Sequence, residues 1–99
     1  MKNCFYEKLG PTDLAIADLC DYYGHGMIIT RINVPKGVFR GTGIGTKLLN
    51  AITNEADVTC TKLFLEISPS DGLNYAQLQE WYERHGFKPW KGIFKRNPK

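Results

Sequence analysis

The residues best suited to chemistry lie in the segment VFRGTGIGTKLL at positions 38–49. Gly41, Gly43 and Gly45 alternate with larger residues, Arg40 precedes them, and an apolar helical pattern follows. Backbone without Cβ atoms can turn several N–H groups toward one point and lets a ligand approach closely. The start of a helix adds unpaired N–H donors and a partial positive charge, and a guanidinium adds a full charge. The segment therefore predicts a binding site for a phosphate or a pyrophosphate, with a plain tight turn as the alternative.

Three phosphate-binding patterns compete for this segment. The P-loop pattern GxxxxGK[ST] fails because Thr46 stands where its second glycine is required. The dinucleotide pattern GxGxxG fails at the same threonine, although Glu66 lies near the distance expected for a ribose-binding acid. The pattern [R/Q]xxGx[G/A] is satisfied in full by Arg40, Gly43 and Gly45.

With this pattern, the stretch INVPKGVFRGTGIGTKLL resembles the acetyl-CoA-binding segment of the GNAT superfamily of N-acetyltransferases. A second stretch, LQEWYERHGF at 78–87, resembles the superfamily's later motif, a helix that ends in a Tyr–Glu–basic–x–Gly–Phe run. The two motifs occur in the expected order, and the resemblance covers residues 27–96. It implies an α/β layered fold with a mixed, mainly antiparallel sheet, flanking helices and a shortened N-terminal region.

The resemblance also implies acetyl-CoA as the co-substrate and no metal. The diphosphate would be bound by the consecutive residues of the glycine turn, namely Arg40, Gly41, Thr42, Gly43, Ile44, Gly45 and Thr46. The strand at 27–34 resembles the strand that splays from its neighbour and holds the acetyl and pantetheine groups by main-chain atoms, which points to Ile32, Asn33 and Val34. Pro35 removes a ladder donor, so a gap in the sheet is expected there.

Acetyl transfer to an amine is helped by an acid that protonates the leaving thiolate. Tyr82 is the candidate acid, because a phenol with a pKa near 10 is neutral at pH 7 and still has a proton to give. In the superfamily, the tyrosine at this place often has that role. The alternative is a core tyrosine beside Trp81, since the helix needs an apolar face.

The amine also needs a base. Alternation in the strand at 63–68 turns Glu66 away from Leu65 and Ile67, either toward a cleft, where it could accept a proton, or toward solvent. His25 has a suitable pKa but stands in a Gly-His-Gly turn, and His85 fits a helix C-terminus, where it would favour that end electrostatically. Glu66 is therefore the candidate base.

The elements that would position these residues follow from the spacing of apolar side chains. Strands are expected at 27–34, 63–68 and 92–96. Helices are expected at 46–57 and 75–86. The segments 1–9 and 14–23 each fit a strand or a helix. This order predicts a single domain over residues 1–99.

Composition narrows the class of protein. Lys+Arg 13 against Asp+Glu 10 gives a net charge of +3, which is too weak to predict nucleic-acid binding. No run approaches the roughly 20 apolar residues of a membrane-spanning helix, and the first residues lack a signal-peptide pattern. Cys4, Cys20 and Cys60 are odd in number and widely spaced, so we expect small buried side chains in a reducing compartment. The protein is therefore expected to be cytoplasmic.

The prediction for function is an N-acetyltransferase that acts on an amine-bearing small molecule or protein. The first alternative is a CoA-binding or regulatory module without catalysis, which the short N-terminal region favours. The second is a nucleic-acid-binding protein that uses the basic tail at 88–99, and it is the weaker one. A homodimer that buries exposed sheet is a further expectation for so small a chain.

Overall fold

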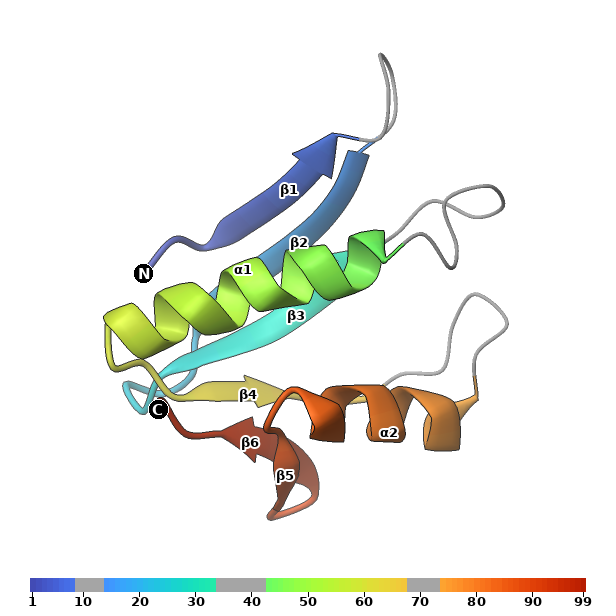
Figure 1. The fold of residues 1–99 in the computed structure, drawn as a ribbon. Helices are drawn as coiled ribbons and strands as arrows, with labels where there is room; N and C mark the ends of the chain where they lie inside the picture. Colours follow the sequence, from blue (N-terminus) through green and yellow to red (C-terminus); the bar gives the residue numbers. More distant parts are fainter. Residues whose placement is uncertain (9–13, 34–42, 68–73) are drawn as a thin grey trace.

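The structure is a computed structural model that describes residues 1–8, 14–33, 43–67 and 74–99 of the chain. Within these residues it has six strands and two helices (Figure 1). The strands are β1 (Cys4–Lys8), β2 (Leu14–Asp21), β3 (Met27–Asn33), β4 (Leu63–Leu65), β5 (Lys88–Trp90) and β6 (Ile93–Arg96). The helices are α1 (Ile44–Val58) and α2 (Tyr75–Arg84).

The six strands form one sheet in the order β1-β2-β3-β4-β6-β5. Neighbouring strands are antiparallel except β3 and β4, which are parallel and are joined through α1. A parallel pair needs such a crossover, whereas antiparallel pairs need only short turns. The mixed, mainly antiparallel sheet with flanking helices confirms the predicted fold class, and no helix precedes β3 among the described residues.

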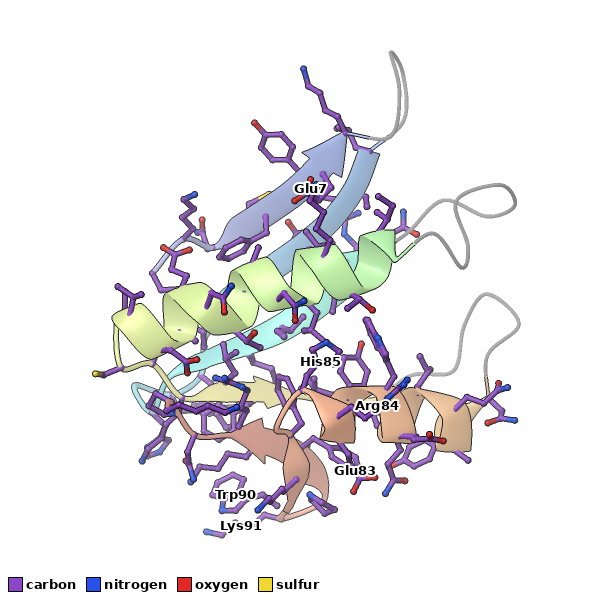
Figure 2. All side chains as sticks on the ribbon, viewed as in Figure 1. Glu7, Glu83, Arg84, His85, Trp90 and Lys91 are labelled. Carbon is purple, nitrogen blue, oxygen red and sulfur yellow. The ribbon has the colours of Figure 1, made fainter. Side chains whose placement is uncertain are left out.

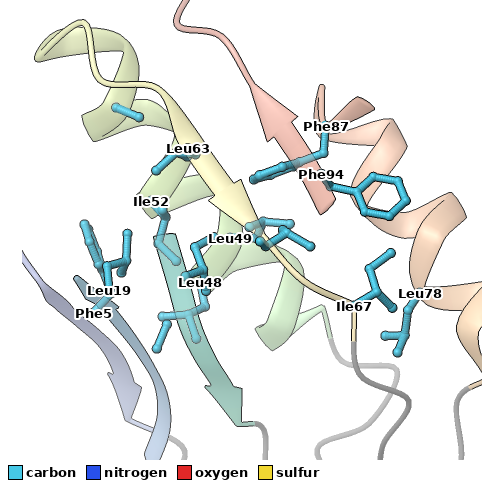
Figure 3. Close-up of a cluster of buried hydrophobic side chains, with 14 of the residues drawn as sticks. Phe5, Leu19, Leu48, Leu49, Ile52, Leu63, Ile67, Leu78, Phe87 and Phe94 are labelled. Carbon is cyan, nitrogen blue, oxygen red and sulfur yellow. The ribbon is translucent and has the colours of Figure 1, made fainter. Parts of the chain in front are cut away.

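Both helices pack on the same face of the sheet. Their buried side chains join those of the strands in a single core cluster (Figure 3). The cluster includes Leu48, Leu49, Ile52 and Ala56 from α1, Leu78 from α2, and Leu63, Leu65 and Phe94 from the sheet. Helical spacing of the α1 residues and alternation along β4 explain why these side chains meet.

The alternation predicted for residues 63–67 is confirmed. Leu63, Leu65 and Ile67 belong to the core beneath the helices. Phe64 points to the other face, where its ring contacts aromatic side chains instead. Glu66 is exposed between two buried neighbours, so it lies on the face of Phe64.

The ambiguous segments near the N-terminus are strands. β1 and β2 pair in register from Cys4 with Asp18 to Lys8 with Leu14. Along β2 every second side chain is buried, at Ala15, Ala17 and Leu19. A strand needs partners, so the local sequence could not decide between strand and helix until this pairing was known.

The expectation that the cysteines are buried is wrong, since all three are exposed. Cys4 and Cys20 fall on the strand positions that face away from the helices, opposite Asp18 and Ile28. Cys60 follows α1 with a positive φ of 55°. Alternation thus decides the exposure of Cys4 and Cys20, because among the described residues no helix covers that face.

Three helix ends are held by specific contacts. Asn74 and Gln77 form a capping box at the start of α2, with hydrogen bonds of 2.9 and 3.0 Å between each side chain and the other's backbone N–H. At the end of α2, the Arg96 Nε donates to the His85 carbonyl oxygen at 2.9 Å. The same guanidinium donates to both carboxylate oxygens of Asp57 at 2.9 and 3.0 Å. Arg96 therefore ties β6 to the ends of both helices.

Neither helix has the length and apolar character needed to cross a membrane, as far as the chain is described.

Candidate active site

The glycine turn leads into α1 through a left-handed residue. Gly43 is the N-cap, with φ 80° and ψ 8°, and its carbonyl oxygen accepts a hydrogen bond from the Lys47 N–H at 2.8 Å. A Cβ added at Gly43 would meet no described atom within 4 Å. The helix begins at Ile44, two residues before the predicted start at 46.

The first turn of α1 offers donors to an anion. No side chain of the described residues caps this helix, and its first turn contains no acidic residue. The N–H groups of the first turn, at Ile44, Gly45 and Thr46, have no partner within the helix itself. They carry the positive end of the helix dipole. Arg40, Gly41 and Thr42, which were predicted to share this role, lie outside the described residues, as does Val34.

β3 separates from β4 close to this helix end. The two strands pair only from Met27 with Leu63 to Ile29 with Leu65, and the rest of β3 pairs with β2 alone among the described residues. Figure 1 shows β3 and β4 diverging on the side where α1 begins. The splayed strand expected from the resemblance is therefore present.

A β-bulge accounts for this separation. The pairing with β2 runs from Asp18 with Arg31 directly to Leu19 with Ile29, so Thr30 is an extra residue in β3. Its Oγ1 donates to the Asp18 carbonyl oxygen at 3.1 Å. Bulges bend a strand and increase its twist. The strands part at Thr30, and Pro35, which was predicted to open a gap in the sheet, lies outside the described residues.

The bulge also decides to which face of the sheet the side chains of the predicted pantetheine-binding residues point. Ile29 and Ile32 are three positions apart, yet both pack against the core, because Thr30 shifts the alternation by one residue. Asn33 pairs with Ile16 and is exposed. Ile44 of α1 packs against the same core as Ile32. Figure 1 shows the end of β3 and the start of α1 on the same side of the fold.

α2 is joined to the first turn of α1 by a contact that the sequence analysis missed. The Trp81 Nε1–H donates to the Thr46 Oγ1 at 3.1 Å, between residues 35 positions apart. The Trp81 ring lies 4.9 Å from the Tyr82 ring and 5.5 Å from the His85 ring, as measured between centroids. The His85 Nδ1 lies 2.8 Å from the Trp81 carbonyl oxygen. No local pattern marks such a contact, since it depends on how two distant helices pack.

Tyr82 is half-buried beside the core. Its ring lies 5.8 Å from that of Phe87 and packs close to Trp81. Burial raises the pKa of Tyr82 to about 12, because a low-dielectric environment disfavours the phenolate. The phenol therefore stays neutral and keeps its proton at every physiological pH.

Glu66 and Tyr82 come from opposite faces of the sheet. Glu66 follows β4 and is exposed on the face of Phe64, whereas Tyr82 belongs to α2 on the helix face. The structure does not bring the two candidate catalytic residues into contact. Glu66 directly follows β4, at the end where β3 and β4 have parted.

Comparison with known proteins identifies the family and supports the fold. The acetyltransferase (GNAT) domain family matches residues 15–89 of the chain. The crystal structure of the anti-CRISPR protein AcrVA5 is similar with a TM-score of 0.66 and 15% sequence identity, over 95% of this chain and 98% of that chain. At that identity the likeness concerns the fold alone. The chain has no significant sequence match among curated proteins. Because the family match extends over most of the sequence, the chain belongs to the GNAT acetyltransferase family.

Proposed function

We propose that the protein is an acetyl-CoA-dependent N-acetyltransferase that acylates a primary amine by direct attack. The observation that carries this proposal is the position of the start of α1, which no described side chain caps, on the same side of the fold as the splayed end of β3. A helix N-terminus with N–H groups that have no partner within the helix, near a strand edge that pairs with no other described strand, suits a ligand with a diphosphate and an amide-rich arm.

The residues present fit such a ligand. The first-turn N–H groups of α1 would bind the diphosphate, and Arg40 would add its guanidinium. Main-chain groups of Ile32, Asn33 and Val34 would bind the pantetheine arm as an added strand would. The ligand supplies an activated acetyl group and a thiolate leaving group.

Tyr82 and Glu66 would handle the protons. A phenol with a pKa of about 12 holds its proton more tightly than a thiol of pKa about 8.5. Tyr82 therefore acts as a hydrogen-bond donor that stabilises the negative charge growing on the leaving sulfur, since complete transfer of its proton to a thiolate of lower pKa is unfavourable. Glu66 would accept the proton of the amine, directly or through water.

A matched pair of glycine variants tests the proposed binding site. Gly43 and Gly92 have nearly the same backbone, with φ 80° and 83°, and at both positions an added Cβ would meet open space. Alanine at either position should cost about 1–2 kcal/mol of stability from the left-handed conformation. We expect only Gly43→Ala to weaken acetyl-CoA binding by isothermal titration calorimetry, by at least about tenfold. Equal affinities of the two variants would place the site elsewhere.

The second candidate is a CoA-binding module without catalysis. The packing of Tyr82 against Trp81 and Phe87 favours it, because those contacts also suit a purely structural tyrosine. Both candidates bind acetyl-CoA, but only the enzyme releases free thiol when amines are added. Thiol release across a panel of amines, measured with a thiol reagent, therefore separates them.

Other parts of the proposal rest on the sequence. The acceptor is an amine-bearing small molecule or protein, nucleic acid is not expected as a partner, and the location is cytoplasmic. A homodimer and a single domain over residues 1–99 also stay predictions.

A further inference from the structure

The face of the sheet opposite the helices has its own aromatic cluster. Phe64 points to this face but is only 1% exposed. Two rings cover it, that of Tyr22 at 4.6 Å and that of Trp90 at 5.5 Å between centroids. Tyr23 extends the cluster at 5.0 Å from Tyr22, and it is 84% exposed.

Two lysines lie over the Trp90 ring, and Figure 2 shows one of them, Lys91, beside Trp90. The Nζ atoms of Lys91 and Lys95 lie 4.9 and 5.0 Å from the ring centroid. Lys88 pairs with Lys95 across β5 and β6, so its side chain shares their face. We call Tyr22, Tyr23, Lys88, Trp90, Lys91 and Lys95 the Trp90 patch.

The positive charge of the Trp90 patch is not neutralised within the described chain. The ion pairs found there join Arg31 to Asp18, Lys47 to Glu7 and Arg96 to Asp57, and none includes a lysine of the patch. Like charges opposite each other in a sheet repel. The patch is therefore complementary to a negatively charged partner.

Two strained turns border the patch. Tyr23 (φ 52°) and Gly24 (φ 77°) form one turn, and Lys91 (φ 48°) and Gly92 (φ 83°) form the other. Turns with two positive φ values favour Asn, Asp or Gly at the first position. A tyrosine and a lysine there weaken the fold, and strained residues gather at functional sites. Both residues extend the aromatic and cationic surface.

The shape of the patch favours an acidic protein segment over a nucleic acid. Lys88 and Lys95 are cross-strand neighbours and Lys91 is at the hairpin tip, so the charges form a compact group. Single-stranded nucleic acids bind in a longer basic groove, along which successive bases stack on aromatic rings. The ring of Trp90 already has two ammonium groups close to it.

We propose that the Trp90 patch docks an acidic segment of the protein that carries the acceptor amine. This rests on the proposed acetyltransferase function. β6 pairs with β4 up to Phe94 with Leu65, one residue before Glu66. The patch and Glu66 thus lie on the same face, so a docked protein would present a lysine next to the proposed base.

Acetylation of two short peptides by the full chain tests the docking surface. Each has one lysine, flanked by glutamates in one peptide and by glutamines in the other. We expect kcat/KM for the glutamate peptide to be about five- to tenfold higher at low salt, since each exposed ion pair adds only a modest factor. High salt should remove the preference.

Charge-reversal variants test whether the Trp90 patch causes the preference for the glutamate peptide. Lys91→Glu with Lys95→Glu should abolish or invert the peptide preference and leave the rate with lysine amide unchanged. The matched control is Lys8→Glu, which makes the same kind of charge change on β1, at the other edge of the sheet. An unaltered preference in the double variant, or an equal loss in the Lys8→Glu variant, would overturn the proposal.

Two further results separate the docking surface from the acetyltransferase proposal. If no amine is acetylated, the proposed acetyltransferase function is wrong. Calorimetry with the glutamate peptide still tests whether the Trp90 patch binds an acidic segment. Binding that is lost in the double variant supports the patch, and absence of binding by the unaltered protein refutes it. Tighter binding of a labelled single-stranded oligonucleotide than of the glutamate peptide, lost in the double variant, would refute an acidic protein segment as the partner.

Discussion

The contacts of Arg96 lead to an asymmetric stability prediction. The Arg96 side chain is 4% exposed and that of Asp57 is 26% exposed, so the cation is the buried partner of the pair. Asp57→Ala leaves this guanidinium without its counter-charge. Breaking a buried pair in this way costs about 3–5 kcal/mol. For a domain of this size the midpoint of thermal unfolding should fall by at least about 12 °C.

The reverse substitution should be milder. In Arg96→Met the Asp57 carboxylate keeps access to water and the hydrogen bond from the Lys99 N–H at 2.9 Å. The methionine fills much of the apolar space of the arginine stem. We expect a loss of about 1–2 kcal/mol, mainly from the missing hydrogen bonds.

The same pair gives stability a defined dependence on pH. The hydrogen bond from Arg96, followed by that from the Lys99 backbone, lowers the pKa of Asp57 below its ordinary value of 3.8. A lowered pKa in the folded state means that the unfolded chain binds the proton first. The contribution is therefore complete above pH 3.8 and is lost as pH falls through the folded-state pKa. The difference between the unaltered chain and Asp57→Ala should shrink over that range.

Urea unfolding followed by tryptophan fluorescence measures these changes, because Trp81 and Trp90 lie on different elements. Asn54→Ala is the control, since Asn54 is exposed on the same helix. Comparable slopes with denaturant would show that only stability has changed. If Arg96→Met destabilises the protein as much as Asp57→Ala, burial of the guanidinium is not the dominant cost and the reasoning fails.

Three further predictions concern the site and its support. Trp81→Phe and Thr46→Val should each weaken acetyl-CoA binding, measured by calorimetry, about two- to tenfold. The double variant should bind no more weakly than either single variant. Additive losses of affinity would show that the hydrogen bond between Trp81 and Thr46 does not position the site. Tyr82→Phe should slow thiol release about a hundredfold without altering acetyl-CoA affinity. The unaltered enzyme should lose no activity through ionisation of Tyr82 below a pH of about 12. Full turnover in the variant would rule out Tyr82 as the acid. Gly86→Ala should destabilise the fold by about 1–3 kcal/mol, because Gly86 has φ 94° and a Cβ there would lie 3.2 Å from the Arg96 Nε; an unchanged urea midpoint would contradict this.

Features with a local cause could be predicted from the sequence. The apolar spacing of α1 and the alternation of Leu63, Leu65 and Ile67 describe one helix face and one strand face, and both are present in the core. The stop of α2 before Gly86, with its positive φ, is equally local. The glycine pattern at Gly43 pointed to the start of a helix, and the structure has one there. Such features depend only on residues a few positions apart, so the spacing of residue types along the chain is enough to predict them.

Features that join distant residues were decided by the tertiary structure alone. The bulge at Thr30 follows from the registers of β2 and β4 against β3, which the strand's own residues do not encode. The contact of Trp81 with Thr46 and the burial of Arg96 arise where segments 35 and 39 positions apart pack together. Cys4 and Cys20 are exposed because both helices lie on the other face of the sheet. Periodicity tells which residues share a face, whereas only the packing of the elements tells which faces are covered.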